Sequence, residues 1–265
     1  MRNRWLRFAL AALVALCIPL WATAQKLPSA PQKAGSPLQL TAPAWQSGPY
    51  WANFDHQLLV DFGNLARFHA ADLTLARHVD ADRVVFIGDS ITEGWKLENS
   101  FPGKPYVNRG ISGQTSSQIL LRFRQDVIDL HPRVTVILAG TNDLAENTGP
   151  VTLEQVEGNL QSMAQLARAN HIAVVLCSVL PSVHYWWHAG LPNPAERIAA
   201  LNHWIEAYAA KEHYPYVNYY AAMKDHSGGL RPDLSPDGVH PSLAGYAVMA
   251  PLARAGIEQA LHEAR

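Results

Sequence analysis

The sequence predicts an α/β protein built as an open three-layer α/β/α sandwich. Short apolar runs such as Val134–Ala139 alternate with stretches whose apolar residues recur every three or four positions, which is typical of βαβ units. The runs are apolar almost throughout, as in strands of a parallel sheet that is covered on both faces. Polar motifs follow the runs, where an open α/β sheet binds its ligands.

Five apolar runs are the candidate strands. They are Arg83–Ile87, Tyr106–Asn108, Val134–Ala139, Ile172–Leu180 and Tyr216–Tyr219. Helical periodicity predicts four helices between and after them, which are Ser116–Leu130, Leu153–Ala169, Pro194–Lys211 and Ser242–His262. Pro251 is expected to end or kink the last helix. A further helix is expected over Phe62–His78, before the first strand.

The N-terminal segment, residues 1–24, has the pattern of a secretory signal peptide. A basic start precedes a short apolar stretch, and Ala22-Thr23-Ala24 has the form of a cleavage site. The stretch is short for a membrane span and Pro19 interrupts it, so we expect export to the periplasm or the outside and no stable membrane anchor. Residues 25–48 are predicted to form a flexible Pro/Ser/Gln-rich leader, and residues 49–265 to form a single domain.

Composition excludes some classes of partner. The chain has 21 Lys and Arg against 22 Asp and Glu. Loss of the signal peptide would remove three arginines and no acidic residue, which makes the net charge of the remaining chain more negative. A mildly acidic surface argues against nucleic acid as the main partner. The chain has two cysteines, and Cys177, within an apolar run, is predicted to be a buried, inert thiol. The spacing of His and acidic residues predicts no metal site.

Four polar motifs stand at or beyond predicted strand ends. Three directly follow strands: Gly88-Asp89-Ser90, Asn108-Arg109-Gly110 and "GTND" at Gly140–Asp143. The fourth, "SPDGVHPS" at Ser235–Ser242, lies beyond the fifth strand. Because the carboxyl ends of parallel strands share one edge of a sheet, we expect these motifs to gather there.

Together these motifs hold the groups that acyl transfer needs. The Ser90 hydroxyl is a weak nucleophile until an imidazole takes its proton, and His240 is the candidate base. Asp237, three residues earlier, can fix the tautomer of that imidazole. Backbone N–H groups of Ser90 and Gly110 and the amide of Asn142 are candidate donors to the oxyanion, each worth about 2.7–4 kcal/mol of barrier.

Alternative readings accompany several of these residues. Ser90 can instead cap a helix, and Asp89 is predicted to have a structural turn or cap role. Arg109 is predicted to be a surface charge. Asp225-His226 is a rival acid–base pair, but adjacent side chains diverge and the surrounding "KDHSGG" is typical of a solvated loop.

The motifs "GDSIT", "NRG", "GTND" and "DGVH" resemble blocks I, II, III and V of the SGNH, or GDSL-type, esterase and lipase family, in the family's order. The resemblance spans roughly residues 83–261. It implies a flavodoxin-like sheet with strand order 2-1-3-4-5, and carboxylic ester hydrolysis without metal or organic cofactor. It implies that Ser90 is the nucleophile, His240 the base and Asp237 the acid, with Gly110 and Asn142 as oxyanion donors.

Aromatic residues near the predicted site are candidates for substrate binding. Trp95 follows the serine turn, and Tyr185, Trp186 and Trp187 follow the fourth strand. These rings can form a wall for an acyl chain or a sugar, or they can pack among themselves.

The resulting hypothesis is an exported serine esterase that cleaves short acyl esters, including O-acetyl groups on carbohydrates, through an acyl-enzyme. Two alternatives remain open. An acyltransferase would use the same residues and exclude water, and a non-catalytic carbohydrate-binding module would keep the fold without the reaction. The sequence does not predict the oligomeric state.

Overall fold

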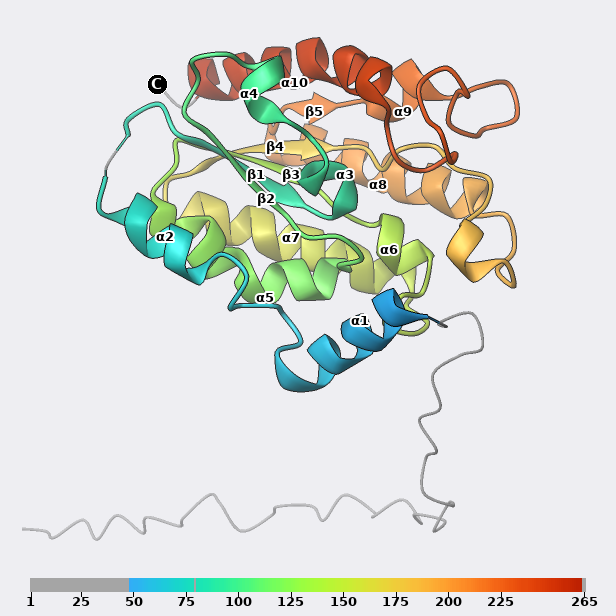
Figure 1. Cartoon of the computed structure of the whole chain (residues 1–265). Coiled ribbons are helices and arrows are strands. Elements are labelled where there is room, and N and C mark those ends of the chain that lie inside the picture. Colours follow the sequence, from blue (N-terminus) through green and yellow to red (C-terminus); the bar gives the residue numbers. More distant parts are fainter. Residues whose placement is uncertain (1–47, 79, 264–265) are drawn as a thin grey trace, which may run out of the picture. The chain divides into compact units, whose positions relative to one another are not determined.

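The computed structural model describes residues 48–78 and 80–263 (Figure 1). Their centre is a five-stranded sheet in the order β2-β1-β3-β4-β5, and all the pairings are parallel. The strands are β1 Val84–Gly88, β2 Tyr106–Gly110, β3 Val134–Leu138, β4 Ala173–Cys177 and β5 Tyr216–Val217. The predicted fold class and strand order are confirmed. The predicted signal peptide, residues 1–24, and nearly all of the predicted leader, residues 25–48, lie outside the described residues.

Helices occupy most of the connections between the strands. They are α1 Pro49–Val60, α2 His69–Ala76, α3 Ser90–Glu93, α4 Leu97–Ser100, α5 Ser116–Asp126, α6 Thr141–Leu144, α7 Leu153–Ala169, α8 Ala195–Glu212, α9 Tyr219–Met223 and α10 Leu243–Glu263, with short 3₁₀ turns η1 Ile128–Leu130 and η2 Trp186–His188. None of the described helices combines the length and the apolar composition that a transmembrane span requires.

The two faces of the sheet bury separate apolar cores. Alternate side chains of β1 point to opposite faces, so that Val85 and Ile87 join one core while Val84 and Phe86 join the other. Helices α5, α7 and α8 cover the first face, and α10 covers the second (Figure 1). Burial of each side chain of this size stabilises the folded state by about 1.5–3 kcal/mol. The strands are apolar on both faces because both faces are covered by helices.

The long helices begin at polar caps. Thr115 opens α5 and Thr152 opens α7, and each forms a reciprocal capping box with the glutamine three residues later. These caps satisfy backbone N–H groups that have no partner in the first turn of a helix. Helix α7 has the predicted bounds.

Three helix predictions need correction. The helix predicted over Ser116–Leu130 ends as α5 at Asp126, and the 3₁₀ turn η1 follows it. The helix predicted over Phe62–His78 is confined to α2, because Phe62 and Gly63 form a turn and Asn64 adopts φ 52°. Pro251 does not end the last helix, since α10 continues through it to Glu263. Pro251 is exposed, while Met249, Ala253 and Ile257 are buried in the second core. That burial offsets the missing backbone hydrogen bond.

Arg109 is buried, and the prediction of a surface charge is wrong. It is 5% exposed, and its Nε lies 2.9 Å from Oδ1 of Asp72 on α2. Its guanidinium also lies 4.6 Å from the ring centre of Phe68. The arginine therefore ties β2 to the polypeptide that precedes the first strand, a contact between segments that sequence spacing does not reveal.

Candidate active site

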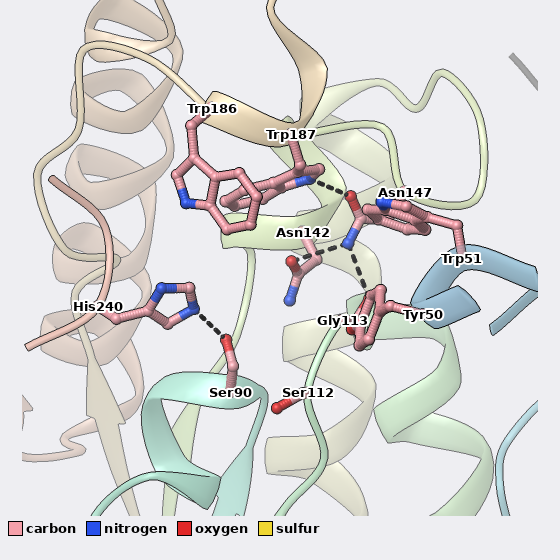
Figure 2. Close-up of a pocket in the computed structure, with 10 residues that line it drawn as sticks. All are labelled: Tyr50, Trp51, Ser90, Ser112, Gly113, Asn142, Asn147, Trp186, Trp187 and His240. Atoms are coloured by element: carbon pink, nitrogen blue, oxygen red, sulfur yellow. Dashed lines mark hydrogen bonds between the residues drawn. The ribbon is translucent and has the colours of Figure 1, made fainter. Parts of the chain in front are cut away.

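Ser90, His240 and Asp237 form a continuous hydrogen-bonded chain at the carboxyl edge of the sheet. Ser90 Oγ lies 2.9 Å from His240 Nε2, and His240 Nδ1 lies 2.7 Å from Asp237 Oδ2. The first of these contacts is drawn in Figure 2. The arrangement allows Nε2 to accept the hydroxyl proton while the carboxylate holds Nδ1–H.

Close packing at the end of β1 produces the turn that presents Ser90. A Cβ on Gly88 would collide with the Thr92 side chain and with the carbonyl oxygen of Leu138. Asp89 then caps α3, since its Oδ1 accepts the N–H of Ile91 at 2.9 Å. The predicted cap role of Asp89 is confirmed. Burial raises the pKa of Asp89 to about 6, against the opposing effects of the Ile91 N–H and of His240.

The loop before α10 holds both Asp237 and His240. Asp237 Oδ1 accepts the backbone N–H groups of Val239 at 3.0 Å and His240 at 2.8 Å, which leaves Oδ2 to face the imidazole. Partial burial raises the pKa of Asp237, but the hydrogen bonds from the His240 ring and from the two backbone N–H groups outweigh it and lower this pKa to about 2. The carboxylate is therefore charged at neutral pH.

The rival pair is not organised in this way. Asp225 accepts hydrogen bonds from Ser227 and Gly229 within its own loop. Its carboxylate therefore serves the turn that contains it and does not orient the neighbouring His226.

Asn142 lies on α6, directly after β3, and lines the same pocket as Ser90 and His240. Its Nδ2 donates to the Gln114 carbonyl at 3.0 Å, and its Oδ1 accepts from Asn147 Nδ2 at 2.9 Å. Figure 2 shows the amide nitrogen on the side toward Ser90. A donor in this position can reach an oxyanion formed at the serine.

The structure corrects the predicted role of Gly110. Its N–H donates to Asn108 Oδ1 at 2.8 Å, and it does not line the pocket. A Cβ there would collide with the Glu93 backbone, so this glycine allows α3 to pack on β2. Gly113 lines the pocket instead, with φ 79°, and its N–H donates to no acceptor within the described part of the chain. Gly113 is therefore the better candidate donor.

A pocket of about 230 Å³ opens beside Ser90. Aromatic rings from two distant segments form much of its wall, Tyr50 and Trp51 from α1 and Trp186 and Trp187 from η2 (Figure 2). Trp186 is 58% exposed. The prediction that Trp186 and Trp187 border the site agrees with this geometry.

Trp95 and Tyr185 are buried away from this pocket, contrary to their predicted contact with substrate. Trp95 is 3% exposed and packs with Phe86 and Tyr246 under α10. Tyr185 is 2% exposed and supports the ring of Trp187, with ring centres 5.1 Å apart. Both rings contribute to the apolar core, which is the more common fate of a large side chain next to a strand.

Sequence reasoning missed five residues that line the pocket: Tyr50, Trp51, Ser112, Gly113 and Asn147. The last three stand within a few residues of the motifs, in "ISGQT" and "GTNDLAEN", where a polar pattern was a usable signal. Tyr50 and Trp51 carry no such signal, because the helix that bears them is brought to the pocket by tertiary packing.

Within the described residues, Cys177 and the possible metal ligands were the other candidates for chemistry. Burial raises the pKa of the Cys177 thiol to about 12, which agrees with an inert side chain. Among residues 48–78 and 80–263, no cluster of His, Cys, Asp and Glu is arranged to hold a metal ion.

Comparison with known proteins identifies the family. Residues 86–248 match the model of the GDSL-like Lipase/Acylhydrolase family. Esterase TesA of Pseudomonas aeruginosa is 32% identical over 186 residues, which cover 64% of this chain and 85% of that protein. Thioesterase 1/protease 1/lysophospholipase L1 of Escherichia coli is 27% identical over 142 residues, which cover 48% of this chain and 67% of that protein.

A solved structure agrees with these matches. A GDSL-like lipase from Bacteroides thetaiotaomicron superposes with a TM-score of 0.73 and 46% sequence identity, over 76% of this chain and 100% of that one. The family match covers most of β1, all of the other four strands, and the loops that carry Ser90, Asn142 and His240. The chain belongs to the GDSL-like lipase and acylhydrolase family and is a carboxylic ester hydrolase.

Proposed function

We propose that this protein is a serine esterase that cleaves short acyl esters through an acyl-enzyme on Ser90. The observation that carries the proposal is the chain of contacts from Ser90 Oγ through the His240 ring to the Asp237 carboxylate, at 2.9 Å and 2.7 Å. A serine hydroxyl with an oriented base and a charged partner has what nucleophilic attack on an ester carbonyl requires.

In the first half-reaction, Ser90 Oγ bonds to the acyl carbon and its proton passes to His240 Nε2. The carbonyl π electrons move to oxygen, and the charged Asp237 stabilises the imidazolium. When the oxyanion collapses, the bond to the alkoxy oxygen breaks and His240 returns the proton to the departing alcohol. A water molecule, deprotonated by the same imidazole, then attacks the acyl-enzyme and releases the acid and free Ser90.

Three donors are available to the oxyanion in this proposal: the backbone N–H groups of Ser90 and Gly113 and the Nδ2 of Asn142. Gly113 and Asn142 line the pocket with Ser90. Gly113 replaces Gly110 here, since the Gly110 N–H is already bonded to Asn108. Preorganised donors of this kind stabilise negative charge that develops only in the transition state.

The pocket favours a short acyl group. Its volume of about 230 Å³ is below the roughly 300–1,000 Å³ that is usual for drug-sized ligands. Exposed Trp186 at its wall offers an apolar ring beside a polar N–H, which suits the alcohol portion of an acylated sugar. Acetylated saccharides are therefore the substrates that we would test first.

Solvent access favours hydrolysis over acyl transfer. The side chains of His240 and Asp237 are 33% and 29% exposed, so that water can reach the base while an acyl-enzyme is present. An acyltransferase requires an acceptor to displace that water. We also propose that the chain is exported, on the basis of its N-terminal sequence pattern.

Replacement of Ser90 tests the mechanism. Ser90→Ala should lower turnover of p-nitrophenyl acetate by roughly 10⁴- to 10⁶-fold while the melting temperature is kept. A fluorophosphonate should label the wild type and the Ser112→Ala variant, which lacks a second hydroxyl of the pocket, but not Ser90→Ala. Labelling of Ser90→Ala, or near-normal turnover by it, would refute the proposal.

A further inference from the structure

A relay of side-chain hydrogen bonds runs from Trp187 to Asn142. Trp187 Nε1 donates to Asn147 Oδ1 at 2.9 Å. Asn147 Nδ2 donates to the Gly113 carbonyl at 3.0 Å and to Asn142 Oδ1 at 2.9 Å. Asn142 Nδ2 then donates to the Gln114 carbonyl at 3.0 Å. Figure 2 shows Asn147 between the indole, Gly113 and Asn142.

The groups that flank the two asparagine amides determine which way each amide faces, and we call this direction of donors and acceptors the polarity of the relay. An indole N–H can only donate, so the Asn147 atom that faces it must be the oxygen. A backbone carbonyl can only accept, so the nitrogen of Asn147 must face Gly113. The same nitrogen faces Asn142, whose oxygen is therefore turned toward Asn147 and whose nitrogen is turned toward Gln114 and the pocket.

This polarity matters because an asparagine amide can turn over. The terminal torsion of the side chain is broad and roughly two-fold, so packing alone distinguishes its two orientations weakly. With the amide reversed, Asn142 would present an oxygen to the position of the oxyanion and repel it. Both N–H bonds of Asn147 Nδ2 point at acceptors of the protein, which leaves this nitrogen none to offer to substrate.

Burial makes the relay rigid. Asn147 is 2% exposed and Asn142 is 3% exposed. A buried polar group that loses its hydrogen-bond partner is destabilising, so a reversed amide in this network is strongly disfavoured. The relay also joins the loop after β2 to α6, through the carbonyls of Gly113 and Gln114. Two of the proposed oxyanion donors are thus held by one connected set of hydrogen bonds.

We propose that Asn147 and the indole N–H of Trp187 are positioning groups, which hold the Asn142 amide with its nitrogen facing Ser90. This inference rests on the proposed function, since it assigns Asn142 as an oxyanion donor. Trp187 thereby acts through its N–H, in addition to forming a wall of the pocket.

A double-mutant cycle with Asn142→Ala tests the inference. In the wild-type background, Asn147→Ala should lower kcat for p-nitrophenyl acetate roughly 10- to 100-fold with little change in KM, as expected when a positioning group is lost. In the Asn142→Ala background the same change should lower kcat less than about 3-fold, because the group that it positions is absent. An equal loss in both backgrounds, or no loss in either, overturns the inference.

Two further variants probe polarity. Trp187→Phe keeps a ring and removes the donor, and it should lower kcat by roughly 3- to 10-fold in the wild-type background alone. Asn147→Asp keeps the acceptor for Trp187 and removes both donors, so that Asn142 should turn its nitrogen away from the pocket; kcat should fall at least as far as with Asn147→Ala. An Asn147→Asp enzyme with wild-type kcat would overturn the proposed polarity.

Matched controls separate positioning from loss of stability. Asn202 is also buried, and its amide bonds to the N–H and C=O of Val179 at 2.7 Å and 2.9 Å. Any effect of Asn202→Ala on kcat should be equal in the two backgrounds, even if its melting temperature falls as far as that of Asn147→Ala. Trp204→Phe, on α8, is the control for the indole. If Asn147→Ala does not fold, the cycle between Trp187→Phe and Asn142→Ala decides the question.

Failure of the proposed function gives a different result. If Asn142→Ala alone leaves kcat unchanged, or Ser90→Ala stays active, the oxyanion or nucleophile assignment is wrong. If both of these variants lose activity as expected and the cycle shows no coupling, the function stands and the relay is refuted.

Discussion

Ser90 and His240 are 150 residues apart in the chain, yet Oγ of the serine lies 2.9 Å from Nε2 of the histidine. The parallel sheet produces this meeting, because Ser90 follows β1 and the loop of His240 precedes α10, which packs on β3, β4 and β5 of the same sheet. The contact therefore depends on the topology of the sheet rather than on local sequence.

Asp237 should stay charged through the acid limb of the pH–rate profile. The hydrogen bonds from His240 and Val239 outweigh burial and hold the pKa of Asp237 at about 2, so the carboxylate stays charged through any ordinary acid limb. Loss of kcat/KM for p-nitrophenyl acetate on acidification should therefore not involve protonation of Asp237. Carboxyl 13C NMR measures the charge state of this residue, and titration of the Asp237 carboxyl above pH 4 would contradict the assignment.

Asp237→Asn should lower kcat roughly 10⁴-fold, because the imidazole loses the partner that fixes its tautomer and stabilises its charge. The measurement is steady-state hydrolysis at neutral pH, with Asp225→Asn as the matched control in the rival loop. The control should retain wild-type turnover, since Asp225 bonds within its own turn. Comparable losses in both variants would argue against the assigned acid.

Asp89→Asn should change how stability depends on pH. Burial raises the pKa of Asp89 from 3.8 to about 6, so between these two pH values the folded protein binds more protons than the unfolded chain. The free energy of unfolding of the wild type should therefore fall as the pH rises through this range, and Asp89 should account for up to about 3 kcal/mol of the fall. The variant keeps an oxygen for the Ile91 N–H and lacks the titration.

Urea denaturation at pH 4 and pH 7 measures this difference. Relative to the wild type, Asp89→Asn should gain stability between the lower and the higher pH. A difference between the two proteins that does not vary with pH would show that Asp89 does not carry the raised pKa.

Loss of one partner of the buried pair formed by Arg109 and Asp72 should be costly. Arg109→Met leaves the Asp72 carboxylate buried without its cation and should lower the free energy of unfolding by about 3–5 kcal/mol. The double change with Asp72→Leu should recover much of that loss. Arg231→Met, which removes an exposed partner of Asp233, is the control and should have little effect. If Arg109→Met and Arg231→Met lowered the free energy of unfolding equally in chemical denaturation, the burial argument would be contradicted.

Trp186→Ala should affect sugar substrates more than small ones. Loss of the exposed ring should raise KM for an acetylated saccharide roughly 2- to 10-fold, and should change KM for p-nitrophenyl acetate less. Trp95→Phe should instead lower the melting temperature with KM unchanged, since Trp95 belongs to the core under α10. Equal effects of Trp186→Ala on both substrates would remove the case for sugar binding.

Local sequence was informative where chemistry and secondary structure coincide. Ser90 and Asn142 stand in short motifs next to predicted strand ends, His240 stands in a motif well beyond the fifth strand, and the pocket brings all three together. The polar pattern after the apolar runs was sufficient to find the first two, whereas His240 was found from its spacing to Asp237 and from the family resemblance of its motif. The same reasoning failed for Gly110, because a glycine after a strand can either serve a ligand or permit close packing, and only the contact with Glu93 distinguishes the two.

The sequence by itself determined the layered α/β class, the strand order through the family resemblance, and the candidate serine, histidine and aspartate. These features depend on periodicity and on short motifs. Only the tertiary structure decided that Trp95 and Arg109 are buried, that Gly113 faces the pocket, that α1 supplies Tyr50 and Trp51 to it, and that Asn147 links Trp187 to Asn142. The physical reason is that burial and hydrogen-bond partners depend on which distant segments pack together, and neither side-chain type nor local spacing encodes that packing.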